Sequence, residues 1–69
     1  MKRFALYKFR KKQKLTQAEM AEKIGVSTSG YVLIELGKRN GTMEFWEKLQ
    51  SVFNLPDEEI WGLMKCEKE

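Results

Sequence analysis

Hydrophobic residues recur along this chain at intervals of three and four positions, the spacing that places side chains on one face of an α-helix. Short polar or glycine-containing segments interrupt the pattern four times. The pattern predicts an all-α protein whose helices begin and end at recognisable signals. The five expected helices cover residues 1–13, 17–24, 28–36, 43–53 and 56–64, and a charged tail that we expect to fray follows from residue 65.

Residues 15–39 carry the densest helix signals. Thr16 stands before a hydrophobic run and Glu19 follows three positions later, which is the spacing of a capping box. Gly25 is suited to the left-handed conformation that ends a helix, and Ser27 is placed to cap the next one. Two short helices joined by a tight, glycine-containing turn form a helix-turn-helix, whose second helix can enter a DNA major groove.

The second helix of this pair has two distinct sides. Tyr31 and Ile34 are three positions apart and are expected to face the core. The residues expected on the outward side are Thr28, Ser29, Val32 and Leu33. If the pair binds DNA, this outward side would read the bases.

Hydrophobic residues at core-facing spacing continue through the last two expected helices, the first of which Thr42 is placed to cap. These residues are Phe45 or Trp46, Leu49, Val52 and Phe53, then Ile60, Trp61, Leu63 and Met64. So small a domain has little room to bury both Trp46 and Trp61. An exposed tryptophan would favour a patch for homodimer formation in the region of the C-terminal helix.

The composition narrows the class of protein. With 42% hydrophobic residues, the 69 residues suffice for one compact domain, which we assign to positions 1–69. A single cysteine, Cys66, excludes an internal disulfide and a Cys-rich zinc site, and the lack of histidine excludes His-based catalysis. We therefore expect no enzyme activity, cofactor, metal or small-molecule ligand. No hydrophobic run approaches membrane-spanning length, so we expect a cytoplasmic protein that does not engage a membrane.

Charge is distributed unevenly along the chain. Residues 1–41 hold ten basic and three acidic residues, a net charge of +7, whereas residues 42–69 hold three basic and seven acidic residues, a net charge of −4. A basic half that contains the outward-facing helix favours a polyanionic partner such as double-stranded DNA. An ordinary solvated surface would also give a net charge of +3.

The motifs LTQAEMAEKIGVS and IELGKR make the chain resemble the Cro/repressor (XRE-like) helix-turn-helix family, typified by lambdoid phage repressors and Cro proteins. The resemblance extends from about residue 6 to residue 64. The closing segment GKRNGTMEFWEKLQSVFNLPDEEIW is similar to members found in phage-derived regions. The resemblance implies a compact lambda-repressor-like domain of five helices, with the helix-turn-helix at about residues 16–36.

The resemblance also implies positions for DNA contacts. Gln17 matches a glutamine that holds a phosphate and braces the reading helix, and Thr28 and Ser29 match positions aimed at bases. Family members grip the sugar–phosphate backbone with the loop that corresponds to Lys38, Arg39 and Asn40. For that loop, a plain turn between helices is the alternative.

Val32 and Leu33 depart from the family, which often carries polar residues at these outward positions. They could pack on thymine methyl groups, turn inward in a slightly rotated helix, or bind a protein partner. In the resembled family, an arginine matching Arg10 pairs with a glutamate matching Glu35. Both residues are present here, and we assign them to a structural ion pair rather than to DNA contact.

The hypothesis from sequence is thus a sequence-specific DNA-binding transcriptional regulator. We expect a phage or prophage repressor that acts as a homodimer by occupying its operator. The alternative is a protein-binding module of the same fold, such as an antitoxin, an antirepressor or a polymerase-associated factor, in which DNA contact is secondary.

Overall fold

Five helices and short connections make up residues 2–66, the part of the chain that the computed structural model describes. The helices are α1 (Phe4–Lys12), α2 (Gln17–Ile24), α3 (Thr28–Glu35), α4 (Met43–Phe53) and α5 (Asp57–Met64). The prediction of an all-α fold is confirmed. None of these helices has the length and hydrophobicity needed to cross a lipid bilayer.

The helix ends follow the predicted capping residues. The Thr16 hydroxyl accepts the Glu19 N–H at 3.1 Å, and the Glu19 carboxylate accepts the Thr16 N–H at 2.9 Å, so the capping box at the start of α2 is complete. Ser27 caps α3 and Thr42 caps α4 through their hydroxyl oxygens. The polar residues at these positions therefore fix where three of the helices begin.

Four expected boundaries differ from those observed, one of them by a single residue at the end of the first helix, which is Lys12 rather than residue 13. The first helix begins at Phe4, because Arg3 has a non-helical backbone and donates its N–H to the Glu35 carbonyl instead. The expected start at Met1 lies outside the described residues, as does the tail beyond residue 66. Helix α3 ends at Glu35 rather than at residue 36, and Pro56 precedes α5 in an extended conformation instead of forming its first turn.

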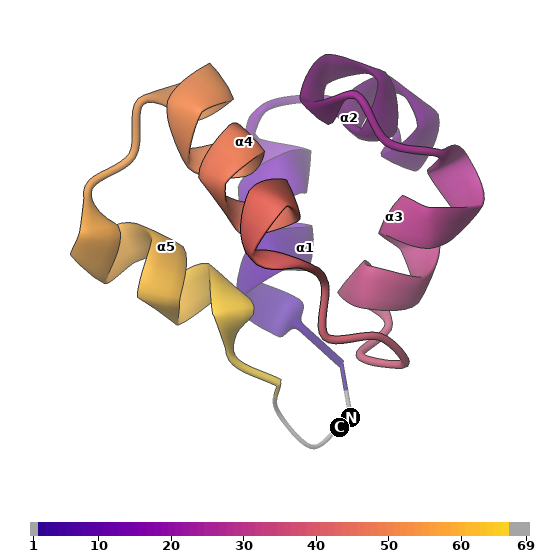
Figure 1. Cartoon of the computed structure of the whole chain (residues 1–69). Coiled ribbons are helices and arrows are strands. Elements are labelled where there is room, and N and C mark those ends of the chain that lie inside the picture. Colours follow the sequence, from indigo (N-terminus) through magenta and orange to yellow (C-terminus); the bar gives the residue numbers. More distant parts are fainter. Residues whose placement is uncertain (1, 67–69) are drawn as a thin grey trace.

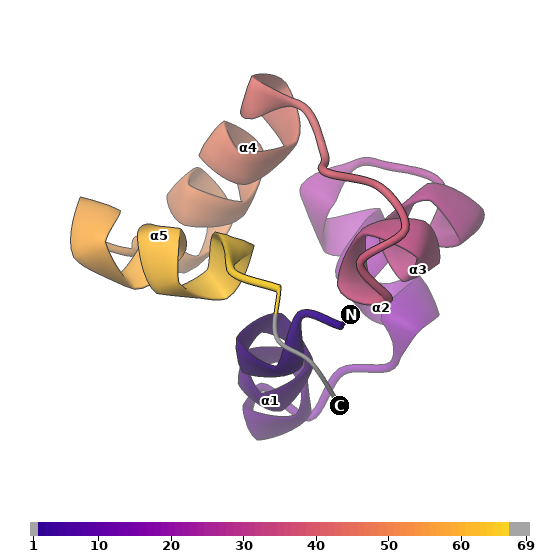
Figure 2. The ribbon, with the colours of Figure 1, turned by 90° about the horizontal axis from the view of Figure 1, so that it is seen from below.

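The five helices form two groups with α1 between them. Figure 1 shows α2 and α3 on one side of the molecule and α4 and α5 on the other. The view from below in Figure 2 shows α1 lying between α5 and the α2–α3 pair. Helix α1 packs against α5 and α3, while α4 packs against α2 and α5. Helix α3 is thereby held from behind, at the opposite side of the domain from α5.

The buried hydrophobic core draws on all five helices. Its members are Leu6, Met20, Ala21, Ile24, Tyr31, Ile34, Phe45, Trp46, Leu49, Ile60 and Leu63. Tyr31 and Ile34 face inward as predicted, and both aromatic candidates at the start of α4 are buried.

The last turn of α4 departs from the expected pattern at one position. The expectation for Val52 is wrong, because its side chain is 45% exposed. Phe53, the next residue along the helix, packs against the core instead, edge-on to Phe9 with 5.0 Å between the ring centres. Successive helical positions point about 100° apart, so the aromatic contact with α1 turns Val52 toward solvent.

Candidate nucleic-acid interface

Helices α2 and α3 and the turn between them build the helix-turn-helix. Gly25 ends α2 with a positive φ of 86°, which is easily adopted only by a residue without a side chain. The Gly25 and Val26 amides both donate to the Ala21 carbonyl, at 2.8 and 3.0 Å, and Val26 packs on the core. The turn is therefore closed by its own backbone and anchored from inside, so the direction of α3 is fixed relative to α2.

The first turn of α3 is exposed and carries hydroxyl groups. Ser27 uses its hydroxyl oxygen to accept the Gly30 N–H at 3.1 Å. Thr28 and Ser29 are exposed. A hydroxyl can both donate and accept a hydrogen bond, so either residue can contact a base edge or a phosphate oxygen.

Val32 and Leu33 lie further along α3, and both are partly buried. They are neither fully enclosed by the core nor fully presented to solvent. The next residue that faces outward, Leu36, is 37% exposed. The charged side chain within α3, Glu35, is buried, so α3 presents hydroxyl and apolar groups at its surface and no charge.

A polar cluster behind α3 joins three helices. The Arg10 guanidinium donates two hydrogen bonds to the Glu35 carboxylate, at 2.9 and 3.1 Å, and both residues are at most 6% exposed. The Tyr31 hydroxyl donates to the same carboxylate at 2.6 Å, and the Gln17 amide donates at 3.3 Å. Gln17 therefore braces α3 through Glu35, while part of its side chain remains accessible. Arg10 and Glu35 form a buried ion pair that faces away from solvent.

The environment of Glu35 favours its charged form. Burial is the strongest single influence and by itself would raise the pKa of this carboxyl group. The hydrogen bonds from Arg10 and Tyr31, together with the Arg10 charge, outweigh burial, so the pKa lies below its ordinary value of 4.5. Burial, followed by the bond to Glu35, raises the pKa of Tyr31 well above its ordinary value. The phenol therefore stays protonated and keeps donating.

The loop after α3 presents cations beside the exposed turn. Lys38, Arg39 and Asn40 have exposed side chains. The Lys38 and Arg39 amides donate to the Leu33 carbonyl at 2.9 and 3.2 Å, which closes the end of α3 and holds the loop against it. The chain here lines one side of a groove of about 390 Å³, which the turn before α3 and two residues of α3, Gly30 and Ile34, also line. The residues lining this groove are Val26, Ser27, Gly30, Ile34, Arg39, Asn40, Gly41, Thr42 and Phe45.

Arg3 belongs to this region, although the sequence pattern assigns it no role beyond its charge. It is 4% exposed, and its guanidinium donates to carbonyl oxygens of α3, of the loop after α3 and of the end of α5. Neither a capping motif nor a hydrophobic spacing in the sequence marks this position as structural. Only the folded arrangement brings these carbonyl groups around it.

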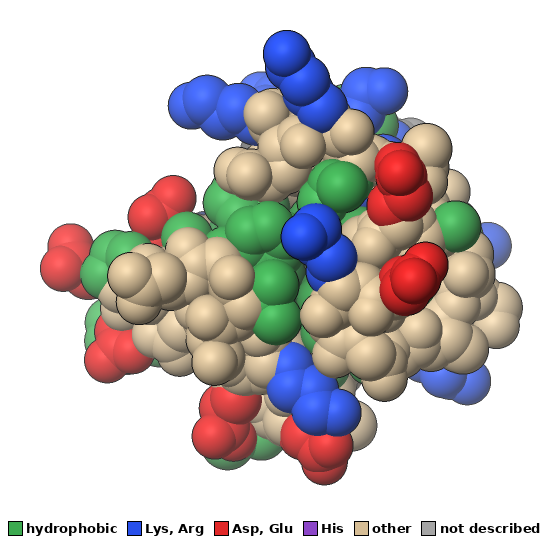
Figure 3. All heavy atoms as spheres, turned by 90° about the horizontal axis from the view of Figure 1, so that it is seen from above, with side chains coloured by type: hydrophobic (Ala, Val, Ile, Leu, Met, Phe, Trp, Pro, Cys, Tyr) green, Lys and Arg blue, Asp and Glu red, His purple; other side chains and the backbone are tan. Residues whose placement is uncertain are grey.

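The space-filling view shows how the charge is distributed on one face. In Figure 3, several Lys and Arg side chains gather along the upper edge and others lie at the centre, right and lower part of the view, a strip of hydrophobic side chains runs through the middle, and acidic side chains lie toward the left, lower and right parts. The segregation along the sequence is therefore partly kept in space. Acidic residues are not confined to the second half, however, because Glu19 and Glu22 are exposed on α2.

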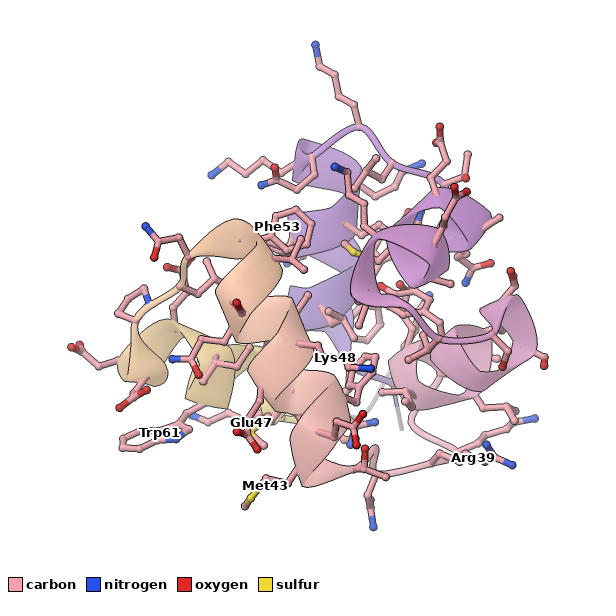
Figure 4. The ribbon with its side chains drawn as sticks, turned by 45° about the horizontal axis from the view of Figure 1, so that its top comes forward. Arg39, Met43, Glu47, Lys48, Phe53 and Trp61 are labelled. Carbon is pink, nitrogen blue, oxygen red and sulfur yellow. The ribbon has the colours of Figure 1, made fainter. Side chains whose placement is uncertain are left out.

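A second exposed surface lies on α4 and α5. Met43 is 76% exposed, Trp61 63% and Met64 38%, and they border a shallow pocket of about 280 Å³. We call these three residues the α4–α5 patch. The expectation that one tryptophan would stay exposed is confirmed, since Trp46 is buried. The core-facing assignment of Trp61 and Met64 is wrong, because α5 buries Ile60 and Leu63 instead and leaves these two exposed. In Figure 4, Met43 and Trp61 lie on one side of α4 and Arg39 lies on the other.

The chain is similar in sequence to known helix-turn-helix proteins. A family model described as helix-turn-helix matches residues 6–60. One relative, described as an uncharacterized HTH-type transcriptional regulator of Archaeoglobus fulgidus, is 37% identical over 68 residues, covering 87% of this chain and 97% of its own. A second regulator with the same description, from the same organism, is 36% identical over 59 residues, covering 86% of this chain and 83% of its own. No solved structure matches.

Proposed function

This chain belongs to the helix-turn-helix family of Cro/repressor (XRE-like) type, and on that premise we propose that it is a sequence-specific regulator of transcription that binds double-stranded DNA. It acts in the cytoplasm as a repressor, in a phage or prophage setting, by occupying its operator and excluding polymerase or a rival regulator. The observation that carries the proposal is the exposed first turn of α3 beside the exposed cations of the following loop.

The outward side of α3 supplies the base contacts in this proposal. Thr28 and Ser29 offer hydroxyl groups to base edges, and Val32 and Leu33 offer apolar surface to thymine methyl groups. Short hydroxyls discriminate less between bases than a bidentate arginine or glutamine does, so DNA shape contributes to selectivity. Val32 and Leu33 are partly buried, which agrees with side chains that pack on the domain and still expose part of their surface to a partner.

The backbone contacts come from both sides of α3. Lys38, Arg39 and Asn40 approach one sugar–phosphate strand from the loop, and Gln17 approaches the other from the start of α2. The side chains of the three loop residues are exposed and can reach outward. Gln17 serves two purposes, since its amide donates to Glu35 while the side chain remains partly accessible. Phosphate contacts of this kind set register and affinity but carry no sequence information directly.

The proposed oligomer is a homodimer formed through the α4–α5 patch. Helices α3 and α5 lie on opposite sides of a domain whose extents are 27 × 26 × 23 Å. If two copies were in contact through the patch, the distance between their α3 helices would therefore exceed the width of one domain. Half-sites of a two-fold operator are separated by about 34 Å, one helical turn. The exposed hydrophobic area of the patch supports burial against a second copy.

Selection of bound duplexes from a random pool, followed by affinity measurements on variants, tests the proposal. Alanine at Thr28, Ser29 or Leu33 should change the preferred sequence. Alanine at Lys38 or Arg39 should weaken binding to all duplexes alike and lower the salt slope by about one for each phosphate that is no longer neutralised. Lys48→Ala, which removes an exposed cation of α4, serves as the control for net charge.

Two outcomes would contradict the proposal. Unchanged sequence preference in the α3 variants would place the reading face elsewhere. Failure to bind any duplex at low salt, with a protein partner retained at high salt, would favour the alternative of a protein-binding module. The apolar edge formed by Val32, Leu33 and Leu36 is the observation that favours that alternative.

A further inference from the structure

We propose that Arg3 is a positioning residue for DNA binding, which fixes the backbone of the loop after α3 so that Lys38 and Arg39 are presented to the phosphates in a preset arrangement. The inference rests on the proposed function, because it assigns the loop to the DNA backbone. It concerns a residue that is buried and that touches no DNA in this scheme.

The guanidinium of Arg3 joins segments that are distant in sequence. Nη1 donates to the Ile34 carbonyl at 2.6 Å and to the Arg39 carbonyl at 2.8 Å, and Nη2 donates to the Asn40 carbonyl at 3.3 Å. On its other edge, Nε donates to the Met64 carbonyl at 2.9 Å. One buried side chain thus connects the last turn of α3, the loop and the end of α5.

Arginine suits this position for chemical reasons. The guanidinium offers five N–H donors in a rigid plane and has no acceptor, so it matches a ring of carbonyl oxygens. Ile34 is in the last turn of α3, where carbonyl groups lack partners within the helix and the helix dipole is negative. Lysine at the same position would keep the charge but could not reach the same set of oxygens from one plane.

Trp46 holds the same stretch of loop with a second donor. Its indole N–H donates to the Asn40 carbonyl at 3.1 Å, and the Arg3 guanidinium carbon lies 5.5 Å from the centre of its ring. The loop then turns at Gly41 with a φ of +81°, where a Cβ would lie 2.9 Å from the indole nitrogen. The Asn40 carbonyl is therefore held by two donors, and the path of the chain after it leaves no room for a side chain.

This arrangement separates a fixed backbone from free side chains. The carbonyl groups of Arg39 and Asn40 are held inside, while their side chains and that of Lys38 are exposed. A loop that is already ordered loses less conformational entropy when it binds. Releasing two or so loop residues would require them to be ordered on binding, which we expect to weaken DNA affinity by about tenfold or more.

The test compares Arg3→Lys with the wild-type chain on a selected operator and on an unrelated duplex, at a temperature at which circular dichroism shows both proteins folded. We expect affinity for both duplexes to fall by about tenfold, with the preference between them unchanged. The salt slope should stay the same because the charge is kept, in contrast to Arg39→Ala, which should lower the slope by about one. Amide hydrogens of residues 38–42 should exchange faster in Arg3→Lys.

Two further variants separate positioning from general stability. Leu63→Val trims a buried side chain of α5 without touching the loop, and we expect it to lower the melting temperature while leaving affinity unchanged. Trp46→Phe keeps an aromatic ring but removes the indole donor, so it should weaken affinity in the same direction as Arg3→Lys. It also provides the test if Arg3→Lys does not fold.

The outcomes separate this inference from the proposed function. If the wild-type chain binds its operator and Arg3→Lys binds with the same affinity and the same loop exchange, the positioning role is overturned while the proposed function stands. The same holds if Leu63→Val weakens binding as much as Arg3→Lys does, because the effect would then follow stability alone. If the wild-type chain binds no duplex, the proposed function fails, and the positioning role fails with it.

Discussion

At the scale of single residues, Glu35 is the side chain on which three helices meet. Three neighbours donate hydrogen bonds to its carboxylate: Arg10 from α1, Gln17 from α2 and Tyr31 from α3. A buried charge is tolerated only when it is paired and hydrogen-bonded, and here these conditions are met together. The cluster therefore fixes α3 to the two helices behind it, and changes to Arg10, Tyr31 or Glu35 should affect stability more than DNA contact.

Removing Arg10 should be strongly destabilising. Arg10→Met would leave the Glu35 carboxylate buried without its cation, and we expect a loss of about 3–5 kcal/mol in the free energy of unfolding, measured by urea denaturation. Lys11→Met, at the neighbouring exposed position, is the control and should change stability by no more than about 0.5 kcal/mol. The double variant Arg10→Met/Glu35→Leu should lose less than the sum of the single losses. Additive losses would show that the pair does not interact as described.

The lowered pKa of Glu35 predicts how stability depends on pH. Because its folded-state pKa lies below the ordinary value of 4.5, the group contributes stability above that value and loses the contribution as pH falls through the folded-state pKa. Urea denaturation at several values between about pH 5 and 3 should show stability falling more steeply for the wild-type chain than for Glu35→Gln. Glu22→Gln, on the exposed side of α2, should follow the wild-type curve. Parallel curves for all three proteins would show that Glu35 does not contribute the expected pH dependence of stability.

At the scale of elements, short polar signals decide where the helices begin and end. Thr16, Ser27 and Thr42 each accept an amide three residues later, and Gly25 and Asn54 end α2 and α4 in the left-handed conformation. These interactions are local, so the residue types and their spacing are enough to recognise them. The start of α1 has no such signal, and the periodic pattern extends that helix too far. A tertiary hydrogen bond between the Arg3 amide and the Glu35 carbonyl sets the boundary instead.

The two glycines inside helices should respond differently to alanine. Gly62 in α5 has open space where a Cβ would be, so Gly62→Ala should raise the free energy of unfolding by about 0.5–1 kcal/mol. At Gly30 in α3, a Cβ would lie 2.9 Å from the Ser27 hydroxyl, which would have to rotate and give up its capping bond. That loss, about 0.5–2 kcal/mol, offsets the gain in helix propensity. Thermal or urea denaturation of both variants checks this, and an equal gain at Gly30 would show that the cap contributes little.

At the scale of the whole molecule, two surfaces face different directions. The first turn of α3 and the loop cations make up one, and the α4–α5 patch makes up the other on the far side of α4 (Figure 4). The Arg3 guanidinium and the Trp46 indole lie between the loop backbone and the patch, since Arg3 bonds carbonyl groups of both and Trp46 lines the patch pocket. This separation is what a two-fold DNA-binding dimer requires, because the reading helices must not be covered by the contact between subunits.

The dimer proposal predicts a specific effect of Trp61. Trp61→Ser would remove the largest hydrophobic side chain of the patch without disturbing the core, since Trp61 is 63% exposed. Sedimentation or light scattering should show weaker self-association, and binding to a two-fold operator should weaken more than binding to a single half-site. Val52→Ser changes another exposed hydrophobic residue of α4, outside the patch, and should leave both measurements unchanged. Equal self-association in the wild-type chain and in Trp61→Ser would place any dimer contact elsewhere.

The sequence by itself determined the features that depend on neighbours within one or two helical turns. The all-α class, the capping box, the turn at Gly25 and the inward side of α3 all follow from spacing and local hydrogen bonding, and the structure has each of them. The residues proposed to contact DNA also came from the sequence, through motif and resemblance, and they remain to be tested.

Only the tertiary structure decided which side chains meet across helices. It buried Trp46 and left Trp61 exposed, turned Val52 outward, directed Gln17 to Glu35, and surrounded Arg3 with carbonyl groups from three distant segments. The spacing of residues along the sequence does not predict such contacts, because they depend on the angles and distances at which whole helices pack. Arg3 shows this most clearly: in the sequence it is one of thirteen basic residues, and in the fold it is buried and joins α3, the loop and α5.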